Sequence, residues 1–332
     1  MTKLLTIAVP TYNRADCLEL LLNTLVDECV GFGDLIDIIV SDNASTDRTQ
    51  TVISRFLERW PSCIAIRYAE NLGPDENFCG CIDKMQSKYF WIIGDDDLPK
   101  AGFIQLLCAK LMSEAPDLVY FGSEWVSVIN GPEQGIQIGP LPVKRLSAED
   151  FASKVNIWMT FISGMVVRLD NLRVVMHPET VRRWKSTSLV QLGWVYAQLR
   201  YGKCFLYIES SCILATAGNT GGYAVIKVFA DNFPRITQET FGTEAPQTRR
   251  IISRAVADFL PGLIWKVRFD NIGSFLREDS YLAVRNRLSN YILFWIFVAP
   301  IMTLPKAFAW PFYFFARLVR KIEVALARVA RI

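Results

Sequence analysis

Three consecutive aspartates, Asp95, Asp96 and Asp97, are the residues of this chain best suited to chemistry. They follow Gly94 and the apolar run Tyr89–Ile93, and such a run bounded by glycine and proline is typical of a buried strand in a mostly parallel sheet. Open α/β sheets place their ligands at the carboxyl ends of the strands. Adjacent carboxylates repel one another, so the triplet favours a hard cation, Mg²⁺ or Mn²⁺, that arrives with a substrate phosphate. The alternative is an acidic turn that begins the following helix.

The stretch before the triplet predicts the elements that position it. Apolar runs that indicate strands alternate with segments of helical periodicity, and each strand ends in a polar loop that contains Asp, Asn or Thr. This alternation predicts a parallel sheet with right-handed crossovers, and it brings four candidate ligand loops to one sheet edge. The predicted strands are Leu4–Val9, Ile36–Val40, Ile64–Tyr68 and Tyr89–Ile93.

Composition excludes several classes of protein. The 332 residues are 51% hydrophobic with a net charge of only +3, so overall charge does not suggest a nucleic-acid partner. The single histidine excludes a His-rich metal site. The eight cysteines lie at irregular spacings in apolar segments, which favours reduced, buried thiols in a cytosolic protein. The apolar stretch at the N-terminus is too short for a signal peptide.

Four motifs occur in order along the first hundred residues: PTYNR at Pro10–Arg14, SDNASTD at Ser41–Asp47, NLGPDENF at Asn71–Phe78 and GDDD at Gly94–Asp97. Together they resemble the nucleotide-sugar domain of family 2 glycosyltransferases, in particular the abequosyltransferase-like branch of bacterial O-antigen assembly. The resemblance implies a GT-A fold, a Rossmann-like and mostly parallel α/β sheet flanked by helices. It also implies a nucleotide-diphosphate sugar donor and a divalent cation, Mn²⁺ or Mg²⁺.

The resemblance assigns the first loops to the donor. Thr11 and Tyr12 line the base pocket, Asp42 accepts hydrogen bonds from the base or the ribose, and Arg14 contacts a phosphate or caps a helix. Asn43 stands where many relatives carry a second aspartate. The complete donor set that the resemblance implies is Pro10, Thr11, Tyr12, Arg14, Asp42, Asn43, Asn71, Gly73, Asn77 and Asp95.

The acidic motif departs from the pattern of many relatives, which read Asp-x-Asp-Asp. Alignment on the last pair puts Gly94 at the first aspartate and makes Asp96 the metal ligand, with Asp97 supporting it and Asp95 near the ribose. Alternatively, Asp95 and Asp97 form the D-x-D pair directly. In either case the resemblance implies a cation that bridges the diphosphate and neutralises the departing nucleotide.

The acceptor side carries fewer signals. Trp158, Ser163 and Gly164 are candidate acceptor residues, with core packing as the alternative for Trp158. Inverting relatives carry an acidic pair at the start of a later helix, where one carboxylate acts as general base. The corresponding stretch here, Ser186–Leu192, contains no acid, and His177, just upstream with Glu179, is the substitute candidate.

The C-terminal third changes character. Residues 291–315 are almost entirely apolar and aromatic, but three prolines and Lys306 interrupt them, and a basic tail follows. We expect an interfacial or re-entrant helix pair at an anionic membrane surface rather than a simple span, with an oligomer interface as the alternative. The predicted organisation is therefore a nucleotide-sugar part at 1–115, an acceptor part at 116–245 and a helical region at 246–332, of which about 291–332 associates with the membrane.

These features predict a transferase at the cytoplasmic face of the bacterial inner membrane. It would move a sugar from a nucleotide-diphosphate donor to a hydroxyl of a polyprenyl-linked saccharide. The missing acid keeps a second hypothesis open, a non-catalytic membrane-associated scaffold that binds sugar nucleotides. A sugar nucleotidyltransferase is disfavoured because no basic, glycine-rich phosphate loop occurs near the N-terminus.

Overall fold

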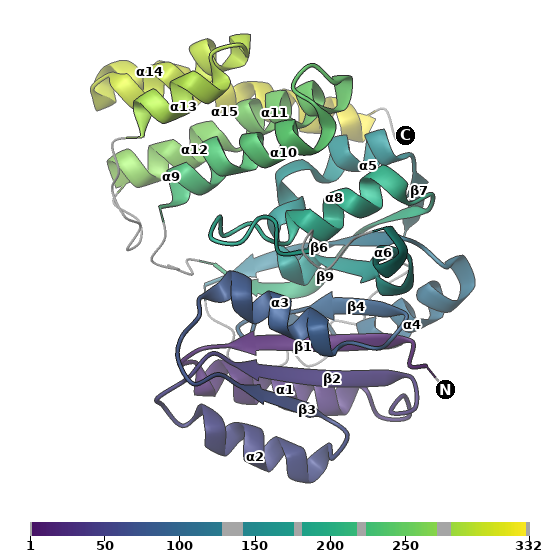
Figure 1. Ribbon diagram of the computed structural model, residues 1–332. Helices are drawn as coiled ribbons and strands as arrows, with labels where there is room; N and C mark the ends of the chain where they lie inside the picture. The colour runs from purple at the N-terminus through teal and green to yellow at the C-terminus, as the bar shows by residue number, and fades with distance from the viewer. Residues whose placement is uncertain (1, 128–141, 176–180, 218–223, 271–279, 330–332) are drawn as a thin grey trace. The chain divides into compact units, whose positions relative to one another are not determined.

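In the computed structural model, which describes residues 2–127, 142–175, 181–217, 224–270 and 280–329, the chain forms two units (Figure 1). The first comprises residues 1–151 and 158–217, and the second comprises residues 152–157 and 218–332. The sheet and all four motifs lie in the first unit.

A mixed sheet forms the centre of the first unit. Its strands run in the order β3-β2-β1-β4-β8-β6-β9-β5, and β7 pairs with β9. Strand β1 pairs with β2 on one side and with β4 on the other, and β3 pairs with β2. The order of the strands therefore reverses direction between β1 and β4, which makes this place a topological switch point. The strands are β1 Leu5–Thr11, β2 Ile36–Asp42, β3 Ile64–Arg67, β4 Tyr89–Ile92, β5 Leu98–Pro99, β6 Leu118–Val126, β7 Val143–Leu146, β8 Met165–Arg168 and β9 Phe205–Thr216.

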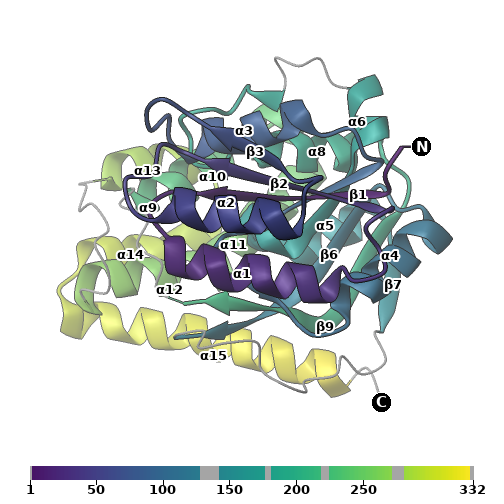
Figure 2. The same ribbon diagram turned by 90° about the horizontal axis from the view of Figure 1, so that it is seen from below.

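Helices cover both faces of this sheet. Figure 2 shows α1, α2 and α4 on one face and α3, α6 and α8 on the other. The prediction of alternating strands and helices is confirmed up to β4. The helices of this part are α1 Ala15–Glu28, α2 Thr49–Arg59, α3 Pro74–Lys84, α4 Phe103–Glu114, α5 Ala148–Val155, α6 Leu169–Val175 and α8 Leu192–Tyr201, with 3₁₀ turns at Asn156–Thr160 and Ile162–Gly164.

The sheet beyond β4 is not parallel throughout. Strand β8 runs antiparallel to both β4 and β6, and β5 and β7 run antiparallel to β9. A 3₁₀ turn at Ile162–Gly164 comes directly before β8, which begins at Met165. This turn brings the preceding loop back toward the end of β4.

Large aromatic side chains fix β4 in the core. Trp91 is fully buried and meets Phe103 and Phe121 edge to face, with ring centroids 5.9 and 5.7 Å apart. Each such pair contributes about 0.5–1.5 kcal/mol beyond the burial of apolar area. The indole N–H of Trp91 also donates to the backbone oxygen of Ser163 at 2.9 Å. Phe90, which points to the opposite face, meets Trp194 edge to face with centroids 6.1 Å apart, so the strand that leads to the aspartates is held on both faces.

The second unit is helical and has an apolar core of its own, which includes Ile252, Trp265, Val284 and Phe294. Its helices are α9 Val225–Lys227, α10 Phe233–Phe241, α11 Pro246–Asp258, α12 Leu260–Trp265, α13 Tyr281–Leu288, α14 Ala299–Thr303 and α15 Lys306–Val329, with π-helical turns at Val228–Asn232, Lys266–Asp270 and Phe294–Val298.

Helix α15 has an unusual distribution of apolar side chains. Ala309 and Ala316 are buried, and the ring of Tyr313 stacks on Trp265 with centroids 4.4 Å apart. Seven large apolar side chains in the part of α15 up to residue 322 are exposed. They are Phe308, Trp310, Phe312, Phe314, Phe315, Leu318 and Ile322, which we call the α15 outer face. None of the helices within the described residues has both the length and the apolar character needed to cross a membrane.

Candidate active site

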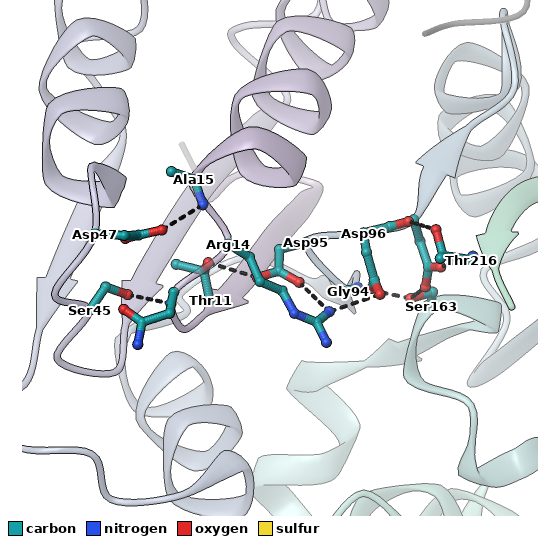
Figure 3. Close-up of polar contacts among 12 residues, drawn as sticks. Thr11, Arg14, Ala15, Ser45, Asp47, Gly94, Asp95, Asp96, Ser163 and Thr216 are labelled. Atoms are coloured by element: carbon teal, nitrogen blue, oxygen red, sulfur yellow. Dashed lines mark hydrogen bonds and ion pairs between the residues drawn. The ribbon is translucent and has the colours of Figure 1, made fainter. Parts of the chain in front are cut away.

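The loop after β4 brings the aspartates to the switch point, and Figure 3 shows Asp95 and Asp96 beside Thr11 and Arg14. Asp95 and Asp97 are each only 5% exposed. Thr11, the last residue of β1, donates its hydroxyl to Oδ2 of Asp95 at 2.7 Å. The first and fourth motifs are therefore joined by a direct contact between two buried side chains.

Arg14 lies between two of the carboxylates. Its Nη1 atom is 3.2 Å from Oδ1 of Asp95 and 2.8 Å from Oδ2 of Asp96. The guanidinium supplies the positive partner that adjacent carboxylates require. The acidic pair of Asp95 and Asp96 is thus compensated by a residue of the first loop.

Asp97 points to the other side, toward residues from distant elements. Ser163 donates its hydroxyl to Oδ2 of Asp97 at 2.5 Å and accepts the N–H of Gly94 at 2.9 Å. The backbone N–H of Thr216 donates to Oδ1 of Asp97 at 3.2 Å, and the Thr216 hydroxyl donates to the backbone oxygen of Asp96 at 2.7 Å. Both oxygens of Asp97 are therefore hydrogen bonded within the protein.

Burial dominates the electrostatics of this loop. Loss of water raises the pKa of Asp95 to about 6, although Arg14 and Thr11 act in the opposite direction. Burial also raises the pKa of Asp97 to about 7, with Ser163 lowering it and Asp96 raising it. Closely spaced carboxylates in low dielectric favour the protonated form, and a bound cation reverses that preference.

The second and third loops form a separate network beside β2. Asn43 donates Nδ2 to Oδ1 of Asn71 at 2.8 Å and to the backbone oxygen of Gly73 at 3.2 Å. Asn77 donates to the backbone oxygen of Ser41 at 3.1 Å and accepts the Ser41 hydroxyl at 2.5 Å. Gly73 has φ of +83°, a conformation that favours glycine, and it places Pro74 at the start of α3. The structure thus brings these four predicted donor residues and Ser41 together.

Two other predicted donor residues differ in exposure. Asp42 is fully buried; Oδ1 accepts the N–H of Ser45 at 2.9 Å, and Oδ2 accepts from Gln50. Tyr12 is 42% exposed, which suits a ring that stacks on a ligand. Pro10 is buried in β1, two residues before Tyr12 in the chain. The donor roles of all three residues stay predictions.

The loops after β1 and β2 are also joined to each other. The N–H of Asn13 donates to the Ser45 hydroxyl at 2.8 Å, and the N–H of Ala15 donates to Oδ2 of Asp47 at 3.0 Å (Figure 3). Asp47 also accepts the N–H and hydroxyl of Thr49, the first residue of α2. Asp47 therefore connects the start of α1 to the first residue of α2.

The acceptor-side candidates lie on the far side of Asp97. Trp158 and Phe161 contact Trp125, with ring centroids 5.9 and 5.0 Å away. Trp125 is 47% exposed. Gly164 is closely packed, since a Cβ there would lie 3.1 Å from the ring of Phe161 and 3.3 Å from the backbone oxygen of Phe121. We call Trp125, Trp158 and Phe161 the aromatic platform.

Sequence reasoning missed Trp125, Phe161 and Thr216 as site residues. Trp125 lies in an apolar strand, where a tryptophan usually signals core packing, and Thr216 reaches the site only because β9 pairs with β5. His177 and Glu179, the substitute base candidates, lie outside the described residues.

The acidic loop fits a divalent cation only if the phosphates of a substrate supply further ligands to the cation. No group of three or more His, Cys, Asp or Glu side chains suitable for a metal occurs within the described ranges. Mg²⁺ and Mn²⁺, however, are commonly bound by one or two carboxylates together with substrate phosphates. Asp96 has a side chain 14% exposed, and the guanidinium beside it shows that this position stabilises a positive charge. The residues present therefore fit a cation bound by Asp96 and completed by a diphosphate.

About half of the chain, including the acidic loop, is similar to a known protein family. Residues 6–168, about half of the chain, match the family described as Glycosyl transferase family 2. The abequosyltransferase RfbV of Salmonella typhimurium is 37% identical over 113 residues, which cover 34% of this chain and 34% of that protein. The minor teichoic acid biosynthesis protein GgaA of Bacillus subtilis is 28% identical over 93 residues, 27% of this chain and 21% of that protein. The matched stretch thus spans about a third or less of these relatives.

Solved structures share the fold at low sequence identity. TarS 1-349 of S. aureus in complex with UDP has a TM-score of 0.62 and 14% identity, covering 96% of this chain and 92% of that chain. The mannosyltransferase PcManGT of Pyrobaculum calidifontis, in complex with GDP-Man and Mn²⁺, has a TM-score of 0.51 and 15% identity, covering 97% and 88%. This likeness confirms the predicted GT-A-like α/β fold.

Proposed function

Because residues 6–168 form a glycosyl transferase family 2 domain, we propose that the chain is a hexosyltransferase of cell-surface polysaccharide synthesis. It transfers a sugar from a nucleotide-diphosphate donor to a hydroxyl of a saccharide acceptor. The observation that carries this proposal is the meeting of Thr11, Arg14 and Asp95–Asp96 at the switch point between β1 and β4. Open α/β sheets bind nucleotides at such a point.

The negatively charged diphosphate of the donor can bind beside the three aspartates once a cation lies between them. Asp96 holds Mn²⁺ or Mg²⁺, which supplies Lewis-acid stabilisation of the diphosphate leaving group when bound. The guanidinium of Arg14 then pairs with the diphosphate of the donor instead of with the carboxylates of Asp95 and Asp96. Asp97 contributes through its contacts with Ser163 and Thr216, which fix the backbone of the acidic loop. Its predicted direct contact with the metal stays a prediction.

The aromatic platform suits the acceptor saccharide. Sugar rings have apolar C–H faces, and an exposed indole offers a flat, apolar surface with an N–H for hydrogen bonding. The platform is linked to the acidic loop, because Phe161 lies two residues before Ser163, which contacts Asp97. We therefore extend the predicted acceptor set of Trp158, Ser163 and Gly164 to Trp125 and Phe161.

A nucleotide-binding experiment tests the donor assignment. UDP, GDP, CDP and dTDP are added singly to the full chain with and without Mn²⁺, and the melting temperature is measured. One of them raises the melting temperature in a Mn²⁺-dependent manner, because a ligand that binds only the folded state stabilises it. Asp96→Ala removes the Mn²⁺-dependent part. Absence of any shift with all four nucleotides contradicts the proposal.

The acceptor is proposed to be polyprenyl-linked and presented at the cytoplasmic face of the inner membrane. The α15 outer face supports this, since it exposes five aromatic rings on a helix that packs inward through small side chains. Arg317, Arg320 and Lys321 are exposed on the same helix. Aromatic rings beside basic residues suit the interface of an anionic bilayer.

Vesicle co-sedimentation tests this membrane assignment. The full chain pellets with phosphatidylglycerol-containing vesicles and much less with pure phosphatidylcholine, and salt weakens the binding because exposed charges are screened. Phe308→Ser with Phe315→Ser reduces pelleting, whereas Val174→Ser, which changes an exposed valine of α6, does not. Equal pelleting of the double variant and the wild type contradicts the assignment.

A further inference from the structure

The turn before α8, residues Ser186–Gln191, holds a costly backbone conformation. Ser186 has φ of +64° and Ser188 has φ of +60°, in the left-handed region that serine rarely adopts. Each such residue costs about 1–3 kcal/mol and persists only where surrounding contacts hold it. The turn itself contains no acidic residue.

A carboxylate from a distant element reaches this turn. Asp75, in the first turn of α3, accepts at Oδ2 the backbone N–H of Thr187 at 3.1 Å and that of Ser188 at 3.0 Å. Asp75 is 7% exposed. The contacts span more than a hundred residues of sequence, so α3 supplies the charge that the turn lacks.

Two buried oxygen atoms at this turn have no hydrogen-bond partner in the described part of the chain. One is Oδ1 of Asp75, and the other is Oε1 of Gln191, whose Nε2 donates to the backbone oxygen of Thr160 at 2.7 Å. An unsatisfied buried acceptor costs about 1–3 kcal/mol, and more if it is charged. Both atoms can only accept, so they suit a ligand that brings hydroxyl donors, as a saccharide does.

We propose that Asp75 is the general base of the transfer reaction, an inference that rests on the function proposed above. Oδ2 stays anchored to the turn while Oδ1 takes the proton of the acceptor hydroxyl. The acceptor oxygen then forms a bond to the anomeric carbon of the donor, and the bond from that carbon to the phosphate oxygen breaks. The nucleoside diphosphate leaves with the electron pair of that bond.

The environment of Asp75 agrees with this role. Burial raises the pKa of Asp75, and the backbone N–H groups of Ser188, Val190, Thr187 and Ser186 lower it without cancelling the effect. A carboxylate that is harder to ionise in water-free surroundings accepts a proton more readily than an exposed one. Anchoring one oxygen by two N–H groups also fixes the direction of the other.

Asp75→Asn separates a catalytic role from a structural one. Asparagine has the same shape, and its side-chain oxygen still accepts the two N–H groups, but it cannot take up a proton. Nucleoside diphosphate release is measured for the full chain with Mn²⁺ and UDP-, GDP-, CDP- and dTDP-linked sugars. Release falls at least about 100-fold, the contribution expected of a general base. The melting temperature stays equal or rises, because the uncompensated buried charge is gone.

Asp83→Asn is the matched control. Asp83 lies on the same helix, and its side chain is 49% exposed and paired with Arg182 on the surface. The same chemical change there leaves nucleoside diphosphate release unchanged, because surface ion pairs contribute little.

Azide provides a second, independent readout. Azide attacks an anomeric carbon without being deprotonated, so it restores nucleoside diphosphate release and yields a glycosyl azide in Asp75→Ala. It restores nothing in Asp96→Ala, where stabilisation of the leaving group is lost. A structural role for Asp75 alone predicts no recovery with azide.

The outcomes distinguish the two proposals. Wild-type activity of Asp75→Asn, with a donor that the wild-type chain turns over, overturns the assignment of Asp75 and leaves the transferase function intact. Loss of activity together with a fall in melting temperature and no azide recovery also overturns it, in favour of a structural clamp. If the wild-type chain releases nucleoside diphosphate from none of the donors, the proposed function fails and the inference fails with it.

Discussion

The acidic loop after β4 and the turn before α8 differ in how completely their polar atoms are paired. In the loop, the oxygens of Asp95 and Asp97 have partners in Thr11, Arg14, Ser163 and Thr216. In the turn, the structure leaves buried oxygens of Asp75 and Gln191 without partners among the residues it describes. In the proposed function, contacts within the protein organise the acidic loop that binds the donor, whereas the turn leaves two oxygen atoms that can accept hydrogen bonds from the hydroxyls of a saccharide.

Removal of the Ser163 hydroxyl should be the most damaging single change to the loop. At the fully buried position 163, Ser163→Ala removes the partner of Oδ2 of Asp97 and of the Gly94 N–H, while Oδ1 of Asp97 keeps the N–H of Thr216. Two orphaned groups lower the free energy of unfolding by about 2–4 kcal/mol, measured by urea denaturation. Ser54→Ala, at an exposed position of α2, serves as the control and changes it by less than about 0.5 kcal/mol. Equal stability of both variants would show that the loop is not preorganised by Ser163.

Arg14→Ala should affect stability less and metal binding more. Its side chain is 34% exposed, so loss of the guanidinium costs about 1–2 kcal/mol, below the value for a fully buried pair. The freed acidic pair binds Mn²⁺ more tightly in the absence of nucleotide, which electron paramagnetic resonance of free Mn²⁺ measures. Arg48→Ala, which removes a surface cation paired with Glu19, leaves Mn²⁺ binding unchanged. Weaker Mn²⁺ binding by Arg14→Ala would contradict the idea that the guanidinium holds the place of a cation.

The aromatic platform should contribute the smallest effect. Trp125→Ala weakens binding of methyl glycosides about tenfold, equivalent to about 1.4 kcal/mol, in saturation-transfer NMR with mannose, galactose, rhamnose and N-acetylglucosamine derivatives. Stability changes little because Trp125 is 47% exposed. Trp125→Phe keeps part of the binding, since a smaller flat ring remains. Unchanged glycoside binding by Trp125→Ala would remove the platform from the acceptor site.

The donor side could be predicted from sequence because its parts follow from local rules. Each buried strand ends in a polar loop, and parallel strands bring their carboxyl ends to one edge, so Thr11 and Asp95 had to lie close together. The four motifs then identified the family from short stretches. The partial antiparallel character of the sheet was not predicted, since nothing in the run 161–168 states which way β8 enters the sheet.

The turn before α8 and the environment of Asp97 depend on contacts between residues far apart in sequence. Asp75 meets Thr187 across 112 positions, and Thr216 meets Asp97 across 119. In the sequence, Asp75 follows Gly73 and Pro74 at the start of a helix. An acidic residue at that position usually stabilises the helix N-terminus, so it did not stand out as a candidate site residue. The apolar run at 291–315 predicted membrane association. The sequence did not show which face of α15 is buried, because that depends on packing against distant residues, such as the stacking of Tyr313 on Trp265.

Nucleoside diphosphate release from nucleotide sugars in the presence of Mn²⁺, compared between the wild-type chain and Asp96→Ala, tests the central claim most directly. The wild-type chain releases a nucleoside diphosphate from at least one UDP-, GDP-, CDP- or dTDP-linked sugar, and chelation of Mn²⁺ stops the release. Asp96→Ala lowers the rate on the order of 1,000-fold, because the charge of the departing diphosphate is no longer neutralised. Equal rates for the two proteins, or no release by the wild-type chain from any of the donors, would contradict the account.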